Sequence, residues 1–510
     1  MPELPQWTIA AVNMLTQGFI LVLGLAVLAI AVMYIADIAQ TRDAIRRNYP
    51  VVGRFRNLFT NLGEFFRQYF FAMDREELPF NRAERDWVYR SARGEGGTVP
   101  FGSTKPLDKV GTAIFVNTPF PVLDDQAAET RPLRIGPHAR QPYDAPSFFN
   151  ISGMSYGALS KPAVRALSKG AAKAGIWMNT GEGGLSPMHL EGGCDIVFQI
   201  GTAKYGVRKA DGGLCDQRLR DMAAIGQVKM FELKLSQGAK PGKGGILPAE
   251  KVTADIAEIR GIPAGQASIS PNRHPEFDDI DGLLDMIGHI REVAGKPVGF
   301  KAVIGSYGWI EDLCEAVTRR GIESAPDFFT IDSGDGGTGA APMALMDNVG
   351  LPVRESLPIA VEILERYGLR GRIRVIASGK LLLPGAAAWA LAAGADFIQC
   401  GRGFMFSLGC IQAMRCHKNT CPTGVTTHDP RLQRGLVVQE KSDRVAEYAD
   451  TVRKHVEMIA HSCGVAEPRQ LRRKHVRIVQ ENGRSLPMTA MDFMPPGEGR
   501  NAPRDLPHQH

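Results

Sequence analysis

The sequence has few cysteines, little net charge and no basic residue near its beginning. Eight cysteines among 510 residues are too few for a fold held together by disulfide bonds. The net charge is +6, and the basic stretches lack the interleaved aromatic residues on which bases stack, so no nucleic-acid partner is expected. No lysine or arginine precedes Arg42, which argues against the basic n-region of a signal peptide.

A long apolar run stands near the beginning of the chain. Residues 18–36 contain no charge, and as a helix they reach about 28 Å, close to the roughly 30 Å hydrocarbon core of a bilayer. Five arginines follow closely: Arg42, Arg46, Arg47, Arg54 and Arg56. The positive-inside rule therefore predicts a single-pass anchor, residues 1–40, in the inner (cytoplasmic) membrane, with the rest of the chain in the cytoplasm. A helix buried in a soluble protein is the alternative.

Residues 41–147 are expected to form a helical and irregular lead-in. Its first part is both basic and aromatic, with Phe65, Phe66, Tyr69, Phe70 and Phe71 close together. Such an amphipathic segment either lies on the bilayer surface or packs against the folded domain that follows.

From about residue 146 onward, short apolar runs alternate with amphipathic helical patterns that end in glycine. The apolar runs are "SFFNISG", "IWMNTG", "KMFELKLS", "KPVGFKAVI", "PDFFTIDSG", "RIRVIASG" and "ADFIQCGRG". The helical patterns include "KPAVRALSKGAAKAG", "PGAAAWALAAG" and "AEKVTADIAEIRG", the last of which is expected to begin near Ala249. This order, repeated over about 260 residues, predicts an α/β fold, a TIM (β/α)8 barrel over residues 148–435. A doubly wound sheet is the competing architecture, but no GxGxxG opens a strand–helix turn. Residues 436–510 are expected to form a helical extension that ends in a flexible tail.

The loops that follow the predicted strands are rich in glycine. They are 153–157, 179–184, 237–245, 334–339 and 378–379. Glycine lets backbone N–H groups approach a ligand closely, so these loops favour a large, flat, phosphorylated ligand across the barrel mouth. Its phosphate is expected at the last two strand ends, near Ser378, Gly379, Gly401 and Arg402. Lys301, a cation inside an apolar strand, is expected to contact the same ligand because an unpaired buried charge is costly.

Three of the cysteines cluster within twelve residues. Cys410, Cys416 and Cys421 stand in "LGCIQAMRCHKNTCPTG", and thiolates followed by proline are common around iron–sulfur clusters. Three thiolates match a 3Fe-4S cluster better than a cubane. Zinc with His417 or His428 as the fourth ligand remains an alternative, as do three unrelated buried thiols.

Several of these segments together carry a resemblance to a known family. The strings "GMSYGALS", "NTGEGG", "KLSQGAKPGKGGILPAEKV", "DGGTGA" and the cysteine segment resemble, in order, the FMN-binding synthase domain of glutamate synthases. The resemblance runs over about residues 148–435. It departs upstream, where glutamate synthases carry a glutaminase domain headed by a nucleophilic cysteine and this sequence has no cysteine before Cys194. The whole looks like the shorter FMN-binding glutamate synthase family proteins of bacteria, many of which have an N-terminal anchor.

The resemblance implies roles for individual residues. Gln237, Lys240 and Arg260 match the site for 2-oxoglutarate, and Glu182 and Lys240 match catalytic positions. A dicarboxylate also requires two cationic anchors, and Lys240 and Arg260 supply them. FMN is expected to contact Gly153, Met154, Ser155, Asn179, Lys301, Ser333, Gly336, Gly337, Thr338, Ser378, Gly379, Gly401 and Arg402.

The implied reaction is reductive amination of a 2-oxo dicarboxylate to glutamate or a related amino acid, with FMN supplying the hydride. Electrons are expected to arrive through the cluster from a ferredoxin-like protein or a separate reductase. Nitrogen is expected as free ammonia, as an amine, or from an amidotransferase partner. Two other functions remain open: a membrane-linked FMN dehydrogenase that oxidises an amino acid or N-alkyl amino acid, and a non-catalytic electron-transfer subunit.

Overall fold

The computed structural model describes residues 5–128, 130–491 and 493, apart from the side chains of Asn57, Glu64 and Phe65. The chain divides into two compact units, Met1–Glu84 and Arg85–His510. Most of the tail that was predicted to be flexible, residues 494–510, lies outside the described residues.

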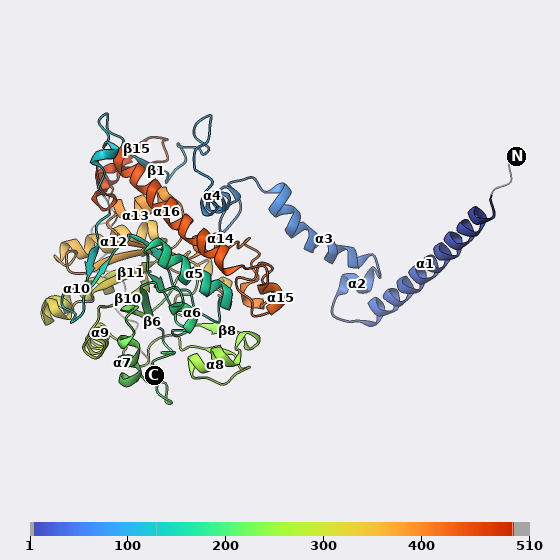
Figure 1. The fold of residues 1–510 in the computed structure, drawn as a ribbon, viewed down its shortest axis with the longest axis horizontal. Helices are drawn as coiled ribbons and strands as arrows, with labels where there is room; N and C mark the ends of the chain where they lie inside the picture. Colours follow the sequence, from blue (N-terminus) through green and yellow to red (C-terminus); the bar gives the residue numbers. More distant parts are fainter. Residues whose placement is uncertain (1–4, 129, 492, 494–510) are drawn as a thin grey trace. The chain divides into compact units, whose positions relative to one another are not determined.

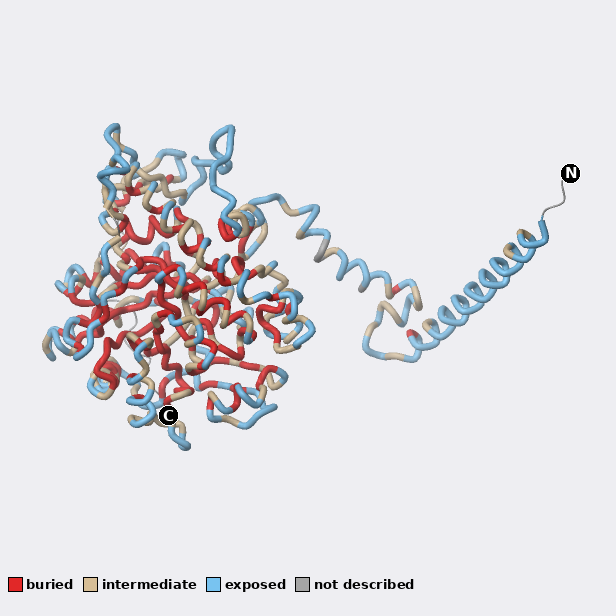
Figure 2. The backbone as a smooth tube through the Cα atoms, viewed as in Figure 1, coloured by how far each residue is buried: buried red, intermediate tan, exposed pale blue. Residues whose placement is uncertain are grey.

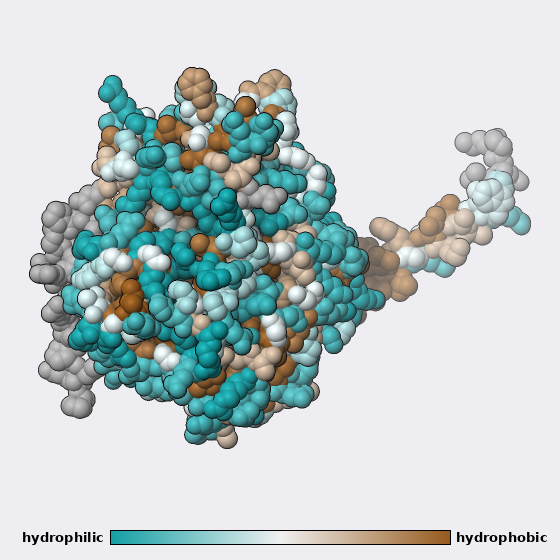
Figure 3. Space-filling model, turned by 60° about the vertical axis from the view of Figure 1, so that its left-hand side comes forward, coloured by the Kyte–Doolittle hydropathy of each residue, from teal (hydrophilic) through white to brown (hydrophobic). Residues whose placement is uncertain are grey.

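The first unit is built from helices. The apolar run lies inside α1 (Gln6–Ala39), and in the described part of the chain this is the helix that is long and apolar enough to cross a membrane. Its residues are exposed almost throughout (Figure 2), and many of them are hydrophobic (Figure 3). After it come α2 (Ala44–Asn48), α3 (Gly53–Phe66) and a π-helical turn, Arg67–Phe71.

The second unit contains a closed barrel of eight parallel strands, which confirms the predicted TIM barrel. In chain order the strands are β4 (Phe149–Ile151), β5 (Met178–Asn179), β6 (Ile196–Ile200), β7 (Val228–Lys234), β10 (Val298–Val303), β11 (Phe328–Asp332), β12 (Arg374–Ser378) and β13 (Phe397–Cys400). The barrel closes where β13 pairs with β4, with Ile398 opposite Phe149. This closure excludes the doubly wound alternative.

Helices surround the barrel (Figure 1). They are α5 (Lys161–Ala174), α6 (Pro187–Leu190), α7 (Asp216–Ala224), α9 (Ile280–Ala294), α10 (Gly308–Arg320), α11 (Met343–Met346), α12 (Val353–Arg366), α13 (Pro384–Ala392) and α14 (Arg402–Ser407). The sequence explains the bounds of α5. The Ser160 side chain accepts a hydrogen bond from the Ala163 N–H, which caps the first turn, and Gly175 ends the helix in the left-handed conformation.

The predicted C-terminal helix is α16 (Val438–Ser462), which follows the short α15 (Pro430–Gln433) and packs against α5. The two helices approach closely at Gly170, where a Cβ atom would lie only 2.4 Å from Val445 Cγ1. A helix that was predicted as an extension is therefore part of the shell around the barrel.

Short strands occur where the sequence analysis expected helical or irregular structure. The hairpin of β2 (Leu133–Ile135) and β3 (Tyr143–Ala145) packs against Trp177 and Phe397, which belong to the amino-terminal side of the barrel core. A second sheet joins β1 (Ala113–Phe115) to β14 (Val476–Val479) and β15 (Ser485–Pro487). The helix α4 (Arg82–Ala92) precedes both.

The connection after β7 is longer than expected and contains its own hairpin. It holds β8 (Ile246–Leu247), α8 (Ala254–Arg260) and β9 (Ser268–Ile269). The helix was predicted to begin near Ala249, which is wrong, because Ala249–Lys251 form a 3-10 turn and Thr253 is the N-cap of α8. The glycine spacing GxGxxG does occur at 334–339, but a loop and the short α11 follow it before α12 begins.

Candidate active site

The residues expected to hold the flavin lie at the carboxyl ends of the barrel strands or in the loops directly after them. They come from β4 (Gly153, Met154, Ser155), β5 (Asn179), β10 (Lys301), β11 (Ser333, Gly336, Gly337, Thr338), β12 (Ser378, Gly379) and β13 (Gly401, Arg402). In a barrel these ends build one shared face. The fold therefore brings segments together that are up to 249 residues apart in the sequence.

Lys301 has a carboxylate beside it. Its Nζ lies 3.8 Å from Asp332 Oδ2, and the same oxygen accepts a hydrogen bond of 3.1 Å from the Gly238 N–H. Both side chains are buried. Lys301 was expected to be buried without a countercharge in the protein, which is wrong, because Asp332 lies beside it. Lys301 and Asp332 together form a buried ion pair beneath the barrel mouth.

A second ion pair, largely shielded from water, joins the loop after β5 to the end of β7. Glu182 Oε1 lies 2.9 Å from Lys234 Nζ, and Lys234 also donates a hydrogen bond to the Gln237 side chain. Burial opposes ionisation of Glu182, but the neighbouring Lys234, Lys240 and Arg260 cations lower its pKa overall. Glu182 is therefore a carboxylate at neutral pH. Lys234 was not among the predicted site residues.

Lys240 and Arg260 are buried cations that form no ion pair with a described residue, although Glu182 lies near enough to raise the pKa of each. Lys240 is 4% exposed and Arg260 is 5% exposed. Within the described residues neither side chain has a carboxylate oxygen within 4.0 Å. Burial, and then the like charge of Lys234, lowers the pKa of Lys240 to about 8. The mouth of the barrel therefore carries positive charge that the protein itself does not fully neutralise.

Neutral groups hold Arg260 in place. Its guanidinium donates hydrogen bonds to Ser268 Oγ (3.1 Å) and Ser155 Oγ (3.3 Å) and lies over the Tyr205 ring, 5.0 Å from the centroid. Its Nε is buried and has no hydrogen-bond partner among the described residues. These contacts fix the direction of the guanidinium without compensating its charge, as an anion-binding site requires.

Below the mouth, the barrel contains a layer of polar side chains, of which only Asn179 was predicted. Glu232 accepts hydrogen bonds from Asn179, Gln199 and Thr330, at 2.8, 2.6 and 2.6 Å. Gln399 in β13 is fully buried, and neither atom of its amide has a partner in the part of the chain that the structure describes. A buried amide without partners is costly, so this position favours a bound polar ligand or water.

Backbone segments approach each other so closely around the mouth that only glycine fits. At Gly379, with φ +108°, a Cβ atom would lie 2.2 Å from Ser333 Cβ. At Gly238 a Cβ atom would lie 2.3 Å from the Ser333 carbonyl oxygen. The glycines at these two positions therefore shape the site.

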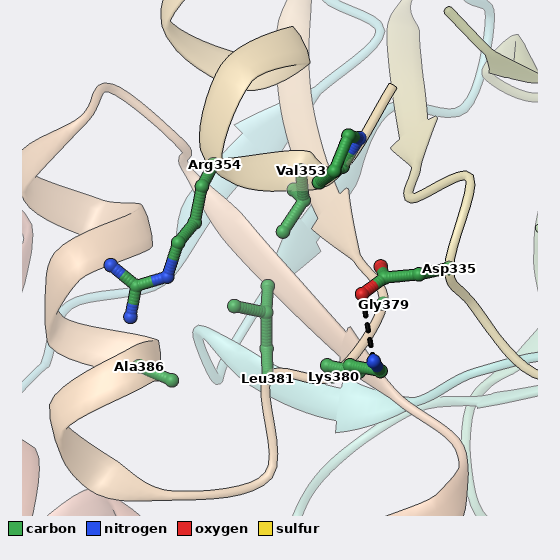
Figure 4. A pocket seen from close by; sticks show the side chains of 8 residues that line it. Asp335, Val353, Arg354, Gly379, Lys380, Leu381 and Ala386 are labelled. Carbon is green, nitrogen blue, oxygen red and sulfur yellow. Dashed lines mark ion pairs between the residues drawn. The ribbon is translucent and has the colours of Figure 1, made fainter. Parts of the chain in front are cut away.

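The expected phosphate end lies around the loops after β11, β12 and β13. Arg402 donates a hydrogen bond to the Asp335 carbonyl (3.4 Å), and Lys380 Nζ pairs with the Asp335 carboxylate at 2.8 Å. Figure 4 shows this pair beside a cavity of about 110 Å³, with Arg354 on another side of it. Four residues separate Gly379 from α13, and α14 has only six residues. The expected phosphate end therefore contains two cations, Arg402 and Lys380, of which Lys380 is paired with Asp335.

The three clustered cysteines influence one another electrostatically. Burial, together with charge on Cys416 and Cys421, raises the pKa of Cys410 to about 12. Hydrogen bonds from Thr423 and Thr426 outweigh the effect of burial and lower the pKa of Cys421. No group of three or more His, Cys, Asp or Glu side chains is positioned to hold a metal in the described residues. The structure therefore gives the neighbourhood of these thiols but no metal site.

The histidines of the zinc alternative differ in their surroundings. His428 Nε2 is 2.8 Å from the Gly157 carbonyl oxygen, and its ring packs edge-on against Tyr156. His417 is exposed. His428 is thus held through Nε2 by the loop after β4.

Lys251 joins the cysteine segment to the barrel mouth and was not predicted. Its buried ammonium donates hydrogen bonds to three carbonyl oxygens, of Ala158 (2.7 Å), Thr426 (2.9 Å) and Cys416 (3.3 Å). Burial lowers the pKa of Lys251 to about 8, and the neighbouring thiols counteract this effect. One side chain therefore connects the loop after β4 with the loop that carries the cysteines.

Comparisons with known proteins agree over most of the chain. Residues 121–466 match the model of the conserved region in glutamate synthase. The glutamate synthase large subunit-like protein YerD of Bacillus subtilis (strain 168) is 40% identical over 501 residues, which cover 91% of this chain and 95% of YerD. The archaeal glutamate synthase (NADPH) of Methanocaldococcus jannaschii is 33% identical over 330 residues, 64% of this chain and 61% of that protein.

The chain spans about half the length of other relatives, such as the archaeal-type glutamate synthase (NADPH) of Thermotoga maritima, of which it covers 53% at 33% identity. Among solved structures, a flavocytochrome b2 mutant with benzoylformate aligns at a TM-score of 0.46 and 14% identity, over 77% of this chain and 78% of that chain. A likeness this distant supports no functional argument. The match over residues 121–466 and the full-length similarity to YerD show that the chain belongs to the glutamate synthase family.

Proposed function

We propose that this protein is an FMN-dependent oxidoreductase of the glutamate synthase type that forms glutamate, or a related amino acid, by reductive amination of 2-oxoglutarate. The observation that carries the proposal is the pair of buried cations, Lys240 and Arg260, that have no carboxylate partner within the described residues. A dicarboxylic 2-oxo acid brings two negative charges, one for each cation, and charge-assisted hydrogen bonds of this kind are strong and directional.

The residues at the barrel mouth fit FMN. Lys301 and the unpartnered Gln399 amide can bond polar atoms of the ring, and Ser378, Gly379, Gly401 and Arg402 can hold the phosphate. Gly153, Met154, Ser155 and Asn179, together with Ser333, Gly336, Gly337 and Thr338, line the same face. When bound, FMN supplies the hydride that reduces a carbon–nitrogen double bond.

Each of these side chains has its own role in the proposed reaction. Lys240 and Arg260, with Gln237, bind and orient the 2-oxo acid. Ammonia and the 2-oxo acid lose water to give an imine, which becomes the amino acid on gaining a hydride and a proton. Glu182, ionised beside Lys234, stabilises the cationic form of this imine. It can also accept a proton from the nitrogen once ammonia has added to the 2-oxo carbon.

Electrons and nitrogen must come from elsewhere. We assign Cys410, Cys416 and Cys421 to a 3Fe-4S cluster that takes single electrons from a ferredoxin-like protein or a separate reductase. The thiols lie near one another, and Lys251 places a cation beside them. Nitrogen is supplied as free ammonia or by an amidotransferase partner.

We further propose that α1 crosses the cytoplasmic membrane and keeps the barrel in the cytoplasm. Support comes from the exposed apolar surface of α1 and from the arginines that follow it. A reporter fused after the last residue should be active in the cytoplasm of a bacterial host. Activity of that reporter in the periplasm would overturn this orientation.

The substrate class can be tested by binding. The full-length protein should purify yellow and release FMN rather than FAD on denaturation, and Lys301→Ala should retain less of it. Adding 2-oxoglutarate should shift the flavin spectrum at concentrations at least tenfold lower than pyruvate requires, because pyruvate leaves one cation unpaired. Release of FAD, or equal affinity for the two acids, would contradict the proposal.

A further inference from the structure

The helix α3 presents a continuous apolar face to solvent. Phe55, Leu58, Phe59 and Leu62 recur at spacings of three and four residues, which places them on one side of a helix. All four are exposed, Phe55 by 52% and Phe59 by 65%. Stacking between the Phe55 and Phe59 rings, 6.3 Å apart, keeps these side chains on that face. Four large apolar side chains on a two-turn stretch of helix are costly to leave in water.

The surroundings of this face are basic. Residues 40–71 contain six arginines and only two acidic residues, Asp43 and Glu64. Thr60 lies on the side of α3 opposite the apolar face, where its hydroxyl donates a hydrogen bond to the Arg56 carbonyl oxygen. An exposed apolar side with arginines around it is the pattern of a helix that lies in the headgroup region of a bilayer and attracts anionic lipids.

A buried ionic cluster fixes the corner between α1 and α3. Asp37 is fully buried; its Oδ1 accepts a hydrogen bond of 2.6 Å from Arg46 and its Oδ2 one of 2.8 Å from Arg54. The Val51 N–H also donates to Oδ2, at 3.0 Å. Asp37 is the first charged residue after the apolar run 18–36, so the cluster stands where that run ends. Arg54 belongs to the first turn of α3, and the direction of α3 is therefore set by the end of α1.

From these three observations we propose that α3 is a second membrane contact, lying in the interface of an anionic bilayer with Phe55, Leu58, Phe59 and Leu62 toward the acyl chains. The Asp37–Arg46–Arg54 cluster holds it at that depth. This inference rests on the proposed membrane anchor, because α1 brings α3 to the surface. The occupant of the apolar face is lipid rather than a second copy of the chain, because the arginines around it complement phospholipid headgroups and the face continues directly from the proposed span.

Tryptophan placed on α3 tests the inference. Full-length Phe59→Trp and Thr60→Trp proteins are reconstituted into vesicles of phosphatidylglycerol and phosphatidylcholine whose acyl chains are brominated close to the headgroup. The parent protein, with its five tryptophans, gives the background signal. Bromine quenches only at contact, so the added fluorescence of Phe59→Trp should fall at least threefold more than that of Thr60→Trp. Equal quenching of the two would overturn the inference.

Two controls distinguish failure of the interfacial helix from failure of the membrane anchor. Leu25→Trp lies in the middle of the proposed span and should be quenched by lipids brominated deep in the acyl chain. Quenching of Leu25→Trp without preferential quenching of Phe59→Trp leaves the anchor standing and rejects the interfacial helix. If Leu25→Trp is not quenched, the anchor is wrong, and Phe59→Trp still decides the surface contact on its own. Unchanged Phe59→Trp quenching in purely phosphatidylcholine vesicles would overturn the role of anionic headgroups.

Discussion

The Glu182 carboxylate and the Lys234 ammonium lie 2.9 Å apart, on the loop after β5 and at the end of β7. Their side chains are 17% and 7% exposed, so neither charge is well hydrated. The pair connects the predicted catalytic glutamate to a lysine that was not predicted. Because both groups are buried, each depends on the other to remain charged.

Removing one member of this pair should destabilise the fold. Glu182→Gln leaves the buried Lys234 ammonium without its countercharge, which costs about 3–5 kcal/mol. Glu182→Gln combined with Lys234→Met should recover most of that loss, since neither charge then remains. Denaturant unfolding of the two variants measures the difference. As a control, Glu191→Gln breaks only the partly exposed pairs with Arg165 and Lys169 and should cost less than about 1 kcal/mol.

Binding of 2-oxoglutarate should weaken as the pH rises through 8. The pKa of Lys240 is lowered to about 8, so its charge is complete below that pH and is lost above it. The dissociation constant, read from the flavin spectrum without ammonia, should rise about tenfold per pH unit above 8 until Lys240 is neutral in the complex as well. Lys240→Arg should remove this dependence, because arginine stays protonated.

Unfolding does not explain such a loss of binding. The folded protein binds the Lys240 proton less tightly than the unfolded chain, where the pKa is 10.5. Between pH 8 and about 10.5 this linkage therefore stabilises the folded state as the pH rises. A dissociation constant that stays flat to pH 10 in the parent protein would show that Lys240 does not bind the substrate.

Arg260→Ala should reduce affinity for 2-oxoglutarate far more than affinity for pyruvate. The lost charge-assisted hydrogen bond is worth about 1.5–3 kcal/mol, or roughly ten- to a hundredfold in affinity. Arg208 also lies over the Tyr205 ring, at 5.8 Å, but is less buried, so Arg208→Ala is the matched control and should leave both affinities unchanged. Equal losses for the two acids in Arg260→Ala would assign Arg260 a purely structural role.

Cys416→Ser should remove iron and the broad visible absorbance of the cluster while FMN stays bound. A hydroxyl does not replace a thiolate as a ligand in a sulfide cluster. Cys463→Ser, at a buried cysteine outside the cluster of three, should keep full iron content. Iron and flavin are measured together in protein prepared without oxygen. One zinc and no iron per chain in the parent protein would refute the assignment.

The sequence predicted most of the barrel because its strands are apolar runs followed by amphipathic helices. It missed β6 (Ile196–Ile200), since only the four-residue α6 separates that strand from the preceding loop. The predicted start of α8, Ala249, lies five residues before the observed start, Ala254. Over a single turn, polar and apolar residues are spaced similarly in a 3-10 turn and in an α-helix, so the sequence does not distinguish the two. Boundaries of this kind depend on tertiary contacts.

The sequence predicted the site residues that belong to a recognisable motif. It did not predict those that only the packing of the fold brings into the site. Lys301 was noticed as a polar residue inside an apolar strand, and the same signal marks Glu232, Lys234 and Gln399. The sequence does not show which of these side chains interact with one another in the fold. The Asp332 partner of Lys301 and the three carbonyl partners of Lys251 come from segments up to 175 residues away.

The most direct test of the proposed function is a single turnover in the absence of oxygen. The flavin of the full-length protein is reduced chemically and then mixed with 2-oxoglutarate and an ammonium salt together, or with each alone. The account predicts reoxidation of the flavin only with both present, with one glutamate formed per flavin reoxidised. No reoxidation with both substrates, together with bleaching of the oxidised flavin by an amino acid or N-alkyl amino acid, would contradict it.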